Sequence, residues 1–332
     1  MEILVHSKQQ DYKVLIERGL LSRVNTFIDP KKRVYIISDT GVPQEYKDSL
    51  MRQFENSSLF VFPQGEASKN LQTFQAILEN MLQENISRND LIIALGGGVV
   101  GDLSGFVAAC YKRGISYINI PTTTLSQIDS SIGGKTAVDL AGVKNCVGAF
   151  WQPSLVLIDP DTLKSLNKRH FYNGVAEAVK MGLICDRELF ELFEKEDAEE
   201  HLEEIIYRSL VAKRDVVAQD ERESGLRKIL NFGHTYGHAF ESYYDLGTYL
   251  HGECVAMGMM QVLEDPQIKE RCKNVLCRLH LPLACEVDKE LIRQIMKNDK
   301  KAEQDSVDLI QVREIGSAVI EKVKIEELIR RL

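Results

Sequence analysis

The sequence predicts an α/β domain with a mainly parallel, doubly wound sheet over residues 1–165, followed by an all-α domain over residues 166–332. In the first half, short runs rich in β-branched and aromatic residues alternate with amphipathic helical stretches. This alternation is typical of parallel sheets with helical crossovers. After residue 165 the strand signal nearly stops and helical periodicity takes over. The length of 332 residues is also more typical of two domains than of one.

The predicted elements follow one another in a regular order. The first is a strand, because MEILVHSKQQDYKVLIERG alternates apolar and polar residues. The amphipathic stretch NLQTFQAILENMLQEN predicts a helix between two later strands. The further strand candidates are residues 34–39, 59–63, 91–95, 117–121 and 155–159.

Composition excludes several classes of partner. The formal net charge of -8 argues against nucleic acid or an anionic membrane as the main partner. The seven cysteines show no C-x-x-C spacing, which favours reduced thiols in a cytoplasmic protein. The N-terminus lacks the features of a signal peptide, and no apolar run is long enough to span a bilayer. We therefore expect a soluble cytoplasmic protein.

A glycine-rich turn between a strand and a helix indicates a dinucleotide site. The strand LIIAL runs into Gly96, Gly97 and Gly98, and an apolar helix follows. Glycines let phosphate approach the backbone, and a helix N-terminus offers free N–H groups. Glycine alone is equally typical of a tight turn, but Asp102 in the first helical turn favours a nucleotide. No arginine in the loop awaits a 2′-phosphate, so NAD is favoured over NADP.

Three histidines within eighteen residues indicate a metal site. His234 and His238 are four residues apart and project from one helical face, and His251 follows. A hydrogen-bonded pair of helix histidines is the alternative. Glu177 is the candidate carboxylate, although a salt bridge with Lys180 would also explain it. Spacing does not decide which two histidines are ligands, and three ligands with an open position suit catalytic Zn²⁺.

Cations recur in the motif-like segments although the protein is acidic. Each alone is typical of a solvated surface, but together with the nucleotide and metal signals they indicate a substrate with phosphate and carboxylate groups. Asp129 follows the strand YINIP, where loops build sites in α/β folds. The cations are Arg113, Lys135, Lys144, Lys180, Lys213, Arg227, Lys300 and Lys301.

Taken together, these segments resemble the 3-dehydroquinate synthase family, in the sugar-phosphate cyclase group. The resemblance extends from residue 63 to residue 301 and rests on eight ordered motifs. The motifs are PQGEASK, GGGVVGDLSGFVAACYKRG, IPTTTLSQIDSSIGGKTAVDL, KNCVGAFWQP, NGVAEAVKMGLI, QDERESGLRKILNFGHTYGHAFE, LHGECVAMGM and NDKK.

The resemblance implies a homodimer with a site in the cleft between the two domains. It implies Glu177, His234 and His251 as ligands of Zn²⁺ or Co²⁺, and gives His238 to the substrate. It implies that Arg113 reaches the neighbouring subunit's site. Implied NAD⁺-binding positions are Asp39, Glu66, Lys69, Gly97, Gly98, Asp102, Thr122, Thr123, Lys144 and Ser165. Implied substrate positions are Arg113, Asp129, Lys135, Lys144, Asn145, Lys180, Lys213, Arg227, Asn231, His238 and Lys300 or Lys301.

The implied activity is a carbon–oxygen lyase reaction of the shikimate pathway. It converts 3-deoxy-D-arabino-heptulosonate 7-phosphate to 3-dehydroquinate and phosphate by transient oxidation, elimination, reduction and aldol closure. The implied catalytic residues are Asp129, Lys135, Lys180, Lys213 and His238. Three alternatives are an NAD- and metal-dependent alcohol dehydrogenase of the glycerol type, another sugar-phosphate cyclase, and a non-enzymatic nucleotide-binding regulator. The phosphate-directed cations argue against the first, and the combined metal and cation sets against the last.

Overall fold

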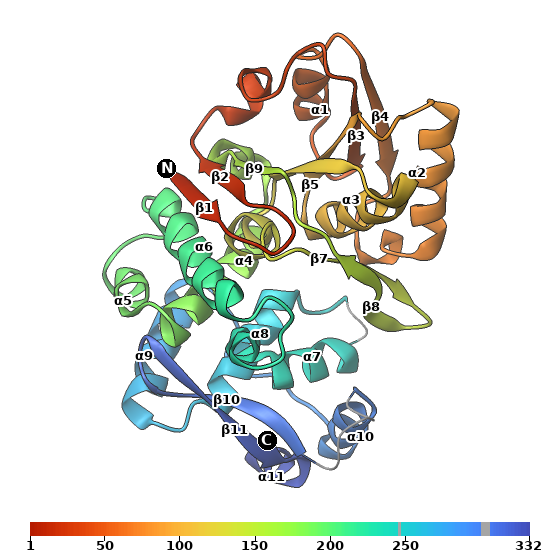
Figure 1. Cartoon of the computed structure of the whole chain (residues 1–332). Helices are drawn as coiled ribbons and strands as arrows, with labels where there is room; N and C mark the ends of the chain where they lie inside the picture. The colour runs from red at the N-terminus through yellow and green to blue at the C-terminus, as the bar shows by residue number, and fades with distance from the viewer. Residues whose placement is uncertain (245–246, 300–305) are drawn as a thin grey trace. The chain divides into compact units, whose positions relative to one another are not determined.

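The computed structural model describes residues 1–244, 247–299 and 306–332 (Figure 1). The chain divides into two compact units, Met1–Leu166 and Asn167–Leu332. Among the described residues, no helix combines the length and the apolar composition needed to cross a bilayer.

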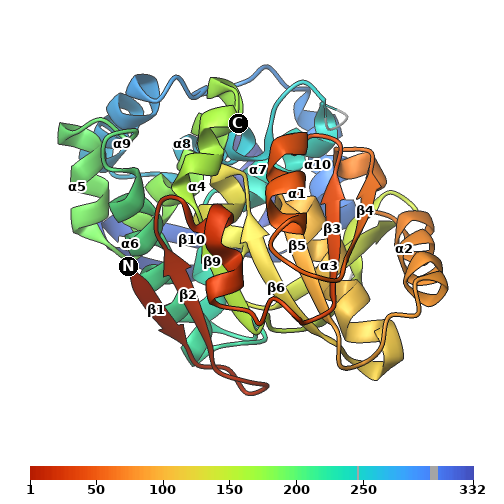
Figure 2. The ribbon, with the colours of Figure 1, turned by 90° about the horizontal axis from the view of Figure 1, so that it is seen from above.

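The first unit is built on a seven-stranded sheet in the order β1-β2-β9-β6-β5-β3-β4. Only the β1–β2 pair is antiparallel, so the predicted mainly parallel sheet is confirmed. Figure 2 shows β1 and β2 at one edge and β3 and β4 at the other. The strands are β1 (Glu2–Val5), β2 (Tyr12–Ile16), β3 (Val34–Asp39), β4 (Ser57–Phe62), β5 (Leu91–Gly96), β6 (Ser116–Pro121) and β9 (Leu155–Ile158).

Alternate residues of the central strands enter two separate cores, one on each face of the sheet. Tyr35 and Ile37 of β3 join the core that contains residues of α2 and α3. Val34 and Ile36 join the core formed with residues of η1 and α1. Because both faces are covered, the strands are continuous apolar runs. The covering elements are η1 (Leu20–Thr26), α1 (Gln44–Met51), α2 (Leu71–Gln83) and α3 (Gly98–Cys110).

Short elements after the strands complete the first unit. A separate antiparallel hairpin, formed by β7 and β8, follows the strand β6 and the π-helical turn η4. These elements are η2 (Glu66–Ser68), η3 (Tyr111–Arg113), η4 (Ser126–Ser130), β7 (Lys135–Leu140), β8 (Val143–Phe150) and η5 (Pro160–Ser165).

The second unit is mostly helical, as predicted. Its α4 starts after Asn167, whose side chain accepts a hydrogen bond from the backbone N–H of His170 and so caps the helix. The helices are α4 (Lys168–Ile184), α5 (Arg187–Lys195), α6 (Leu202–Gln219), η6 (Leu226–Asn231), α7 (His234–Tyr243), α8 (His251–Val262), α9 (Pro266–Arg278), α10 (Lys289–Asp299) and α11 (Ile325–Arg331).

The second unit departs from the predicted all-α composition in one place. Strands β10 (Ser306–Glu314) and β11 (Ser317–Lys324) form an antiparallel hairpin around Gly316, whose φ of 88° suits a tight turn. In β10, Val307 and Leu309 are buried while the intervening residue is less so, which is the alternation of a half-buried strand. The hairpin packs against α4 and α11 and extends the helical core instead of forming a domain of its own.

Candidate metal centre and nucleotide-binding turn

Three helices of the second unit bring a carboxylate and two imidazoles together. Glu177 lies in the middle of α4, and His234 and His251 are the first residues of α7 and α8. Glu177 Oε1 is 3.3 Å from His251 Nε2 and 3.6 Å from His234 Nε2. One possible ligand atom from each residue lies within 4.8 Å of the others. The residues predicted as metal ligands therefore converge.

Hydrogen bonds on the far side of each imidazole orient both rings. His234 Nδ1 donates to the Phe232 carbonyl at 3.0 Å, and His251 Nδ1 lies 3.4 Å from Glu241 Oε1. Each ring is thus held through Nδ1 and presents Nε2 to Glu177. A partner on the second ring nitrogen is the usual way in which proteins fix the tautomer of a metal-binding histidine. Glu241 was not among the predicted site residues, although it is three positions from His238 on the same helix.

Burial and neighbouring charges set the protonation of the three clustered side chains. Glu177 is 1% exposed, and its Oε2 lies 2.5 Å from the Lys180 ammonium. Burial raises the pKa of the Glu177 carboxyl, but the adjacent ammonium and imidazole groups outweigh it and hold that pKa well below its usual value. Burial lowers the pKa of His234 to about 3, which leaves its imidazole neutral. Burial acts likewise on His251, but hydrogen bonds to two carboxylates raise its pKa to about 10.

These three side chains fit a zinc-type ion. Two imidazoles and one carboxylate form a known catalytic Zn²⁺ ligand set, and nitrogen ligands favour Zn²⁺ or Co²⁺ over Mg²⁺ or Ca²⁺. The salt bridge between Glu177 and Lys180 that the sequence left open is present, and the same carboxylate also faces the histidines, so the salt bridge is compatible with the predicted role of Glu177 as a ligand. His238 is exposed and forms a second possible group with Glu241 and His251. The Glu177 group is the more buried of the two.

Close backbone packing sets the positions of the metal-site helices. A Cβ on Gly252 of α8 would lie 1.9 Å from the Asn173 carbonyl oxygen of α4. A Cβ on Gly258 would lie 1.9 Å from the Gly233 carbonyl, next to His234. Since backbone cannot move aside as a side-chain tip can, glycine at these two positions permits the contacts. Each of the two histidines therefore has a neighbouring glycine, Gly252 beside His251 and Gly233 beside His234, at which two helices come into close backbone contact.

The predicted cations of the second unit are buried, which is unusual for lysine and arginine. Lys180 is 2% exposed, Lys213 of α6 is 6% and Arg227 of η6 is 2%. The elements α4, α6 and η6 pack against one another, so these cations belong to one region of the unit. Asn231 of η6 donates through Nδ2 to Glu223 Oε1 at 2.6 Å. Lys300 and Lys301 lie outside the described residues.

In the first unit, the predicted nucleotide residues collect at the carboxyl ends of adjacent strands. Strand β5 ends at Gly96, α3 begins at Gly98, and the Thr122 backbone N–H after β6 donates to the Gly96 carbonyl at 2.9 Å. A Cβ on Gly97 would approach Thr123 Cγ2 to 3.0 Å. Asp39 ends the neighbouring strand β3, and burial raises its pKa. Carboxyl ends of parallel strands are where α/β sheets bind ligands.

The PQGEASK loop joins this site through Lys69. The Lys69 ammonium, 5% exposed, lies 2.7 Å from Asp102 Oδ2 and 3.4 Å from Glu66 Oε1. Burial lowers the pKa of Lys69, but the two carboxylates outweigh that effect and raise it. Glu66 and Lys69 of the loop and the more distant Asp102 of α3 therefore form one charged cluster beside the glycine turn.

The remaining predicted residues of the first unit lie around this region or at its margin. Asp129 is in η4, and η4 approaches the turn because a Cβ on Gly98 would lie 3.3 Å from Ser130 Oγ. The hairpin is tied to the PQGEASK loop, since the Asp139 N–H donates to the Lys69 carbonyl and Asp139 Oδ1 accepts from the Asn145 N–H. The other positions are Lys135 and Lys144 on the hairpin strands, exposed Arg113 in η3 and exposed Ser165 in η5.

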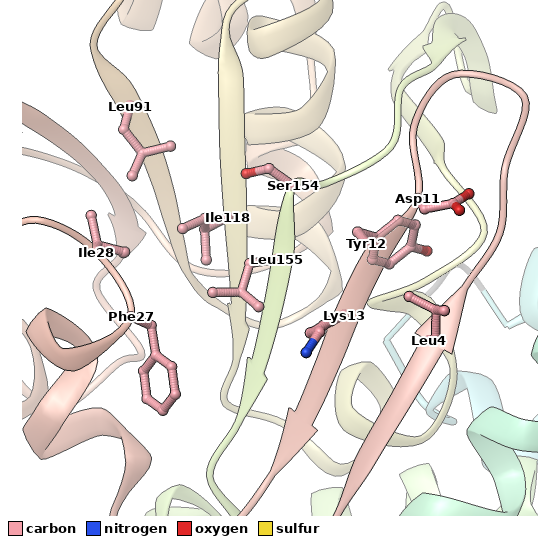
Figure 3. A pocket seen from close by; sticks show the side chains of 10 residues that line it. All are labelled: Leu4, Asp11, Tyr12, Lys13, Phe27, Ile28, Leu91, Ile118, Ser154 and Leu155. Carbon is pink, nitrogen blue, oxygen red and sulfur yellow. The ribbon is translucent and has the colours of Figure 1, made fainter.

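A cavity of about 470 Å³ lies elsewhere in the first unit (Figure 3). Leu91 and Leu155, the first residues of β5 and β9, line it together with Ile118 and Phe27. It therefore lies toward the amino ends of the strands, away from the glycine turn at their carboxyl ends. Its lining also includes Asp11, Lys13 and Ser154, but it contains neither the predicted cations nor the metal cluster.

Comparison with known proteins identifies the family. A family model described as 3-dehydroquinate synthase N-terminal matches residues 59–173, and one described as 3-dehydroquinate synthase C-terminal matches residues 174–302. The 3-dehydroquinate synthase of Clostridium kluyveri is 39% identical, covering 98% of this chain and 96% of the relative. That of Streptococcus thermophilus is 41% identical, covering 99% of this chain and 98% of the relative.

Solved structures share the whole fold. A 2-deoxy-scyllo-inosose synthase complexed with carbaglucose-6-phosphate, NAD⁺ and Co²⁺ is 25% identical, covers 99% of both chains and superposes with a TM-score of 0.90. A 2-epi-5-epi-valiolone synthase from Streptomyces hygroscopicus subsp. jinggangensis, with NAD⁺ and Zn²⁺ bound, is 28% identical and covers 98% of this chain and 97% of its own, with a TM-score of 0.87. A probable glycerol dehydrogenase from Sinorhizobium meliloti shares only the fold, at 14% identity and a TM-score of 0.64.

Fold and side-chain clusters thus define a class of two-domain enzymes, with a glycine turn in an α/β unit and a carboxylate–imidazole cluster in a helical unit. Within that class, the chain belongs to the 3-dehydroquinate synthase family, as the matches over residues 59–302 show. The family predicted from the sequence motifs is confirmed.

Proposed function

We propose that this chain acts as a 3-dehydroquinate synthase in the shikimate pathway. It converts 3-deoxy-D-arabino-heptulosonate 7-phosphate to 3-dehydroquinate and phosphate, as a carbon–oxygen lyase. The observation that carries the proposal is the nearly full-length match to curated 3-dehydroquinate synthases at 39–41% identity. The convergence of Glu177, His234 and His251 supports it, since this chemistry needs a Lewis acid.

The proposed cofactors are NAD⁺ and one divalent ion, Zn²⁺ or Co²⁺. Both fit the residues present, and the two solved synthases hold NAD⁺ together with Co²⁺ or Zn²⁺. Glu177, His234 and His251 would hold the ion. The glycine turn with Glu66, Lys69 and Asp102 would hold the nucleotide, with Asp39, Thr122, Thr123, Lys144 and Ser165 in the same role. When bound, NAD⁺ accepts and later returns a hydride, while the ion stabilises the substrate oxygen at the oxidised carbon.

The chain's own residues bind, orient and move protons. Lys180, Lys213 and Arg227 offer buried positive charge to the phosphate and carboxylate of the substrate. His238 is exposed one helical turn beyond His234, which suits it to exchange a proton with a substrate oxygen. Holding the substrate's charged ends fixed also brings its two reacting carbons together for ring closure. Asp129, Lys135, Lys144, Asn145 and Asn231 are proposed to contribute substrate contacts, and Lys300 or Lys301 one more.

The proposal is tested by incubating the purified protein with NAD⁺, Zn²⁺ and the heptulosonate phosphate. We expect 3-dehydroquinate and inorganic phosphate in equal amounts. Phosphate release without the carbocycle would point to an enzyme that only eliminates phosphate. No turnover of this substrate, with turnover of a hexose or other heptose phosphate, would instead assign the chain to another cyclase.

We further propose a cytoplasmic homodimer in which Arg113 reaches the partner subunit's site. Arg113 is exposed and adopts a φ of 66°, in the left-handed region that non-glycine residues rarely occupy. Mixing inactive Arg113→Ala with inactive Lys180→Ala tests the arrangement. Mixed dimers should regain part of the activity, because one of their two sites would be wild type. Proven subunit exchange without recovery would reject it.

A further inference from the structure

One face of α4 carries a row of three side chains that all meet the start of α8. Arg169, Asn173 and Glu177 are spaced four residues apart, and such positions lie on one side of a helix. Glu177 faces His251, the first residue of α8. Arg169 and Asn173 do not belong to the metal cluster. Each of them nevertheless makes hydrogen bonds to residues that lie within three positions of His251.

Arg169 holds the first turn of α8 through a two-pronged ion pair. Its Nε and one terminal nitrogen lie 2.7 Å from the two carboxylate oxygens of Glu253, and that terminal nitrogen also donates to the Thr248 carbonyl at 2.7 Å. Glu253 Oε2 in turn accepts from the Leu250 backbone N–H at 2.8 Å. Glu253 is mostly buried, with 10% of its side chain exposed. The backbone on both sides of His251 is thus fixed to α4.

Asn173 holds the next residue. Its Oδ1 accepts a hydrogen bond from the Gly252 backbone N–H at 2.6 Å, in a buried position. Its backbone carbonyl leaves no room for a Cβ on Gly252, as described above. Because the first N–H groups of a helix have no partner within the helix, this contact also satisfies one of them. His251 is therefore flanked by residues that α4 itself holds.

We propose that Arg169 and Asn173 are positioning residues that fix His251 relative to Glu177 and thereby set the protein's affinity for its divalent ion. The inference rests on the proposed metal site. Metal affinity depends on how well the ligands are held before the ion arrives, and outer contacts of this kind typically change it about 10- to 100-fold. Without Arg169, the first turn of α8 loses its anchor while all three ligands remain.

A matched control lies in the same unit. Arg271 of α9 makes the same two-pronged pair with Glu194 of α5, with both contacts at 2.7 Å and with similar exposure of the arginine. That pair joins two helices that carry none of the three ligands. It therefore separates a general loss of stability from a specific loss of metal affinity.

The experiment measures Co²⁺ dissociation constants by competition with a chromophoric chelator at fixed pH, together with the Co²⁺ absorption spectrum. Arg169→Met should weaken binding about 10- to 100-fold and alter the spectrum, while Arg271→Met should change neither. Arg169→Lys should bind Co²⁺ more tightly than Arg169→Met but less tightly than the wild type. It also provides the test if Arg169→Met does not fold. Asn173→Ala should likewise weaken Co²⁺ binding.

Wild-type Co²⁺ affinity in Arg169→Met would overturn the inference, and so would wild-type Co²⁺ affinity in both single variants Arg169→Lys and Asn173→Ala. A loss of Co²⁺ affinity in Arg271→Met equal to that in Arg169→Met would overturn it as well. A wild-type protein that binds no Co²⁺, or that binds it unchanged in His234→Ala, would instead remove the proposed metal site itself.

Discussion

The glycine turn of the first unit is built mainly from backbone, whereas the metal cluster of the second unit is built from side chains on three helices. Gly96, Gly97 and Gly98 are contiguous, and the strand and helix around them follow at once in the sequence. Glu177 and His251 are 74 positions apart and meet only because α4 and α8 pack closely. The turn is therefore a local structure, while the cluster depends on the packing of the whole helical unit. Substitutions should affect the two regions differently.

The largest effect is expected for Glu177→Gln. It removes a metal ligand and also removes the carboxylate charge that faces the Lys180 ammonium, which is 2% exposed. Removing one partner of a buried ion pair typically costs about 3–5 kcal/mol of stability. We expect both loss of bound zinc, measured by elemental analysis, and a lower free energy of unfolding in urea. Glu188→Gln, at a pair where Glu188 is 76% exposed, should change neither. Full zinc content in Glu177→Gln would refute the assignment of this ligand.

Glycine substitutions compare the two regions directly. In Gly252→Ala the new methyl group would meet backbone, at 1.9 Å from a carbonyl oxygen, so α8 must move away from α4. We expect the free energy of unfolding to fall by about 1–3 kcal/mol and metal binding to weaken. In Gly98→Ala the nearest atom is a serine hydroxyl at 3.3 Å, which can rotate. This variant should keep its stability but bind NAD⁺ more weakly, as calorimetry can measure. Equal stability losses would contradict the contrast between the two regions.

A smaller effect is expected for Asp102→Asn. Lys69 would keep Glu66 but lose its closer carboxylate, at 2.7 Å, so the charged cluster beside the turn would loosen. Because the loss of one charge-assisted hydrogen bond is comparable in free energy to a tenfold change in affinity, we expect the NAD⁺ affinity to fall about tenfold. Metal content should stay at the wild-type level. The control is Glu79→Gln on the exposed side of α2, and an unchanged NAD⁺ affinity in Asp102→Asn would remove this residue from the nucleotide site.

The same difference between local and long-range structure explains what the sequence could predict. Strand β3 was predicted with the bounds that it has, because a buried parallel strand is a continuous apolar run. The hairpin β10–β11 was not predicted, because its two strands follow a long series of helices instead of alternating with them. The ligand set was reached through the family resemblance, because spacing alone treats His234 and His238 alike.

Residues that act on the site through others left no pattern in the sequence. Arg169 and Glu253 are 84 positions apart, and each alone is an ordinary charged residue near a helix start. Glu241 and Asp139 likewise matter only through the partners that folding brings to them. Such contacts depend on how the helices and hairpins pack, which periodicity and motif spacing do not contain.

We infer that the chain oxidises and re-reduces its substrate within one turnover, so that NAD⁺ is a catalyst and not a co-substrate. The most direct measurement follows phosphate release with NAD⁺ far below the heptulosonate phosphate concentration. We predict that release runs to completion and that free NADH does not accumulate. If release stops at one phosphate per NAD⁺, or NADH builds up in step with turnover, the protein is a net oxidoreductase and the lyase assignment is wrong.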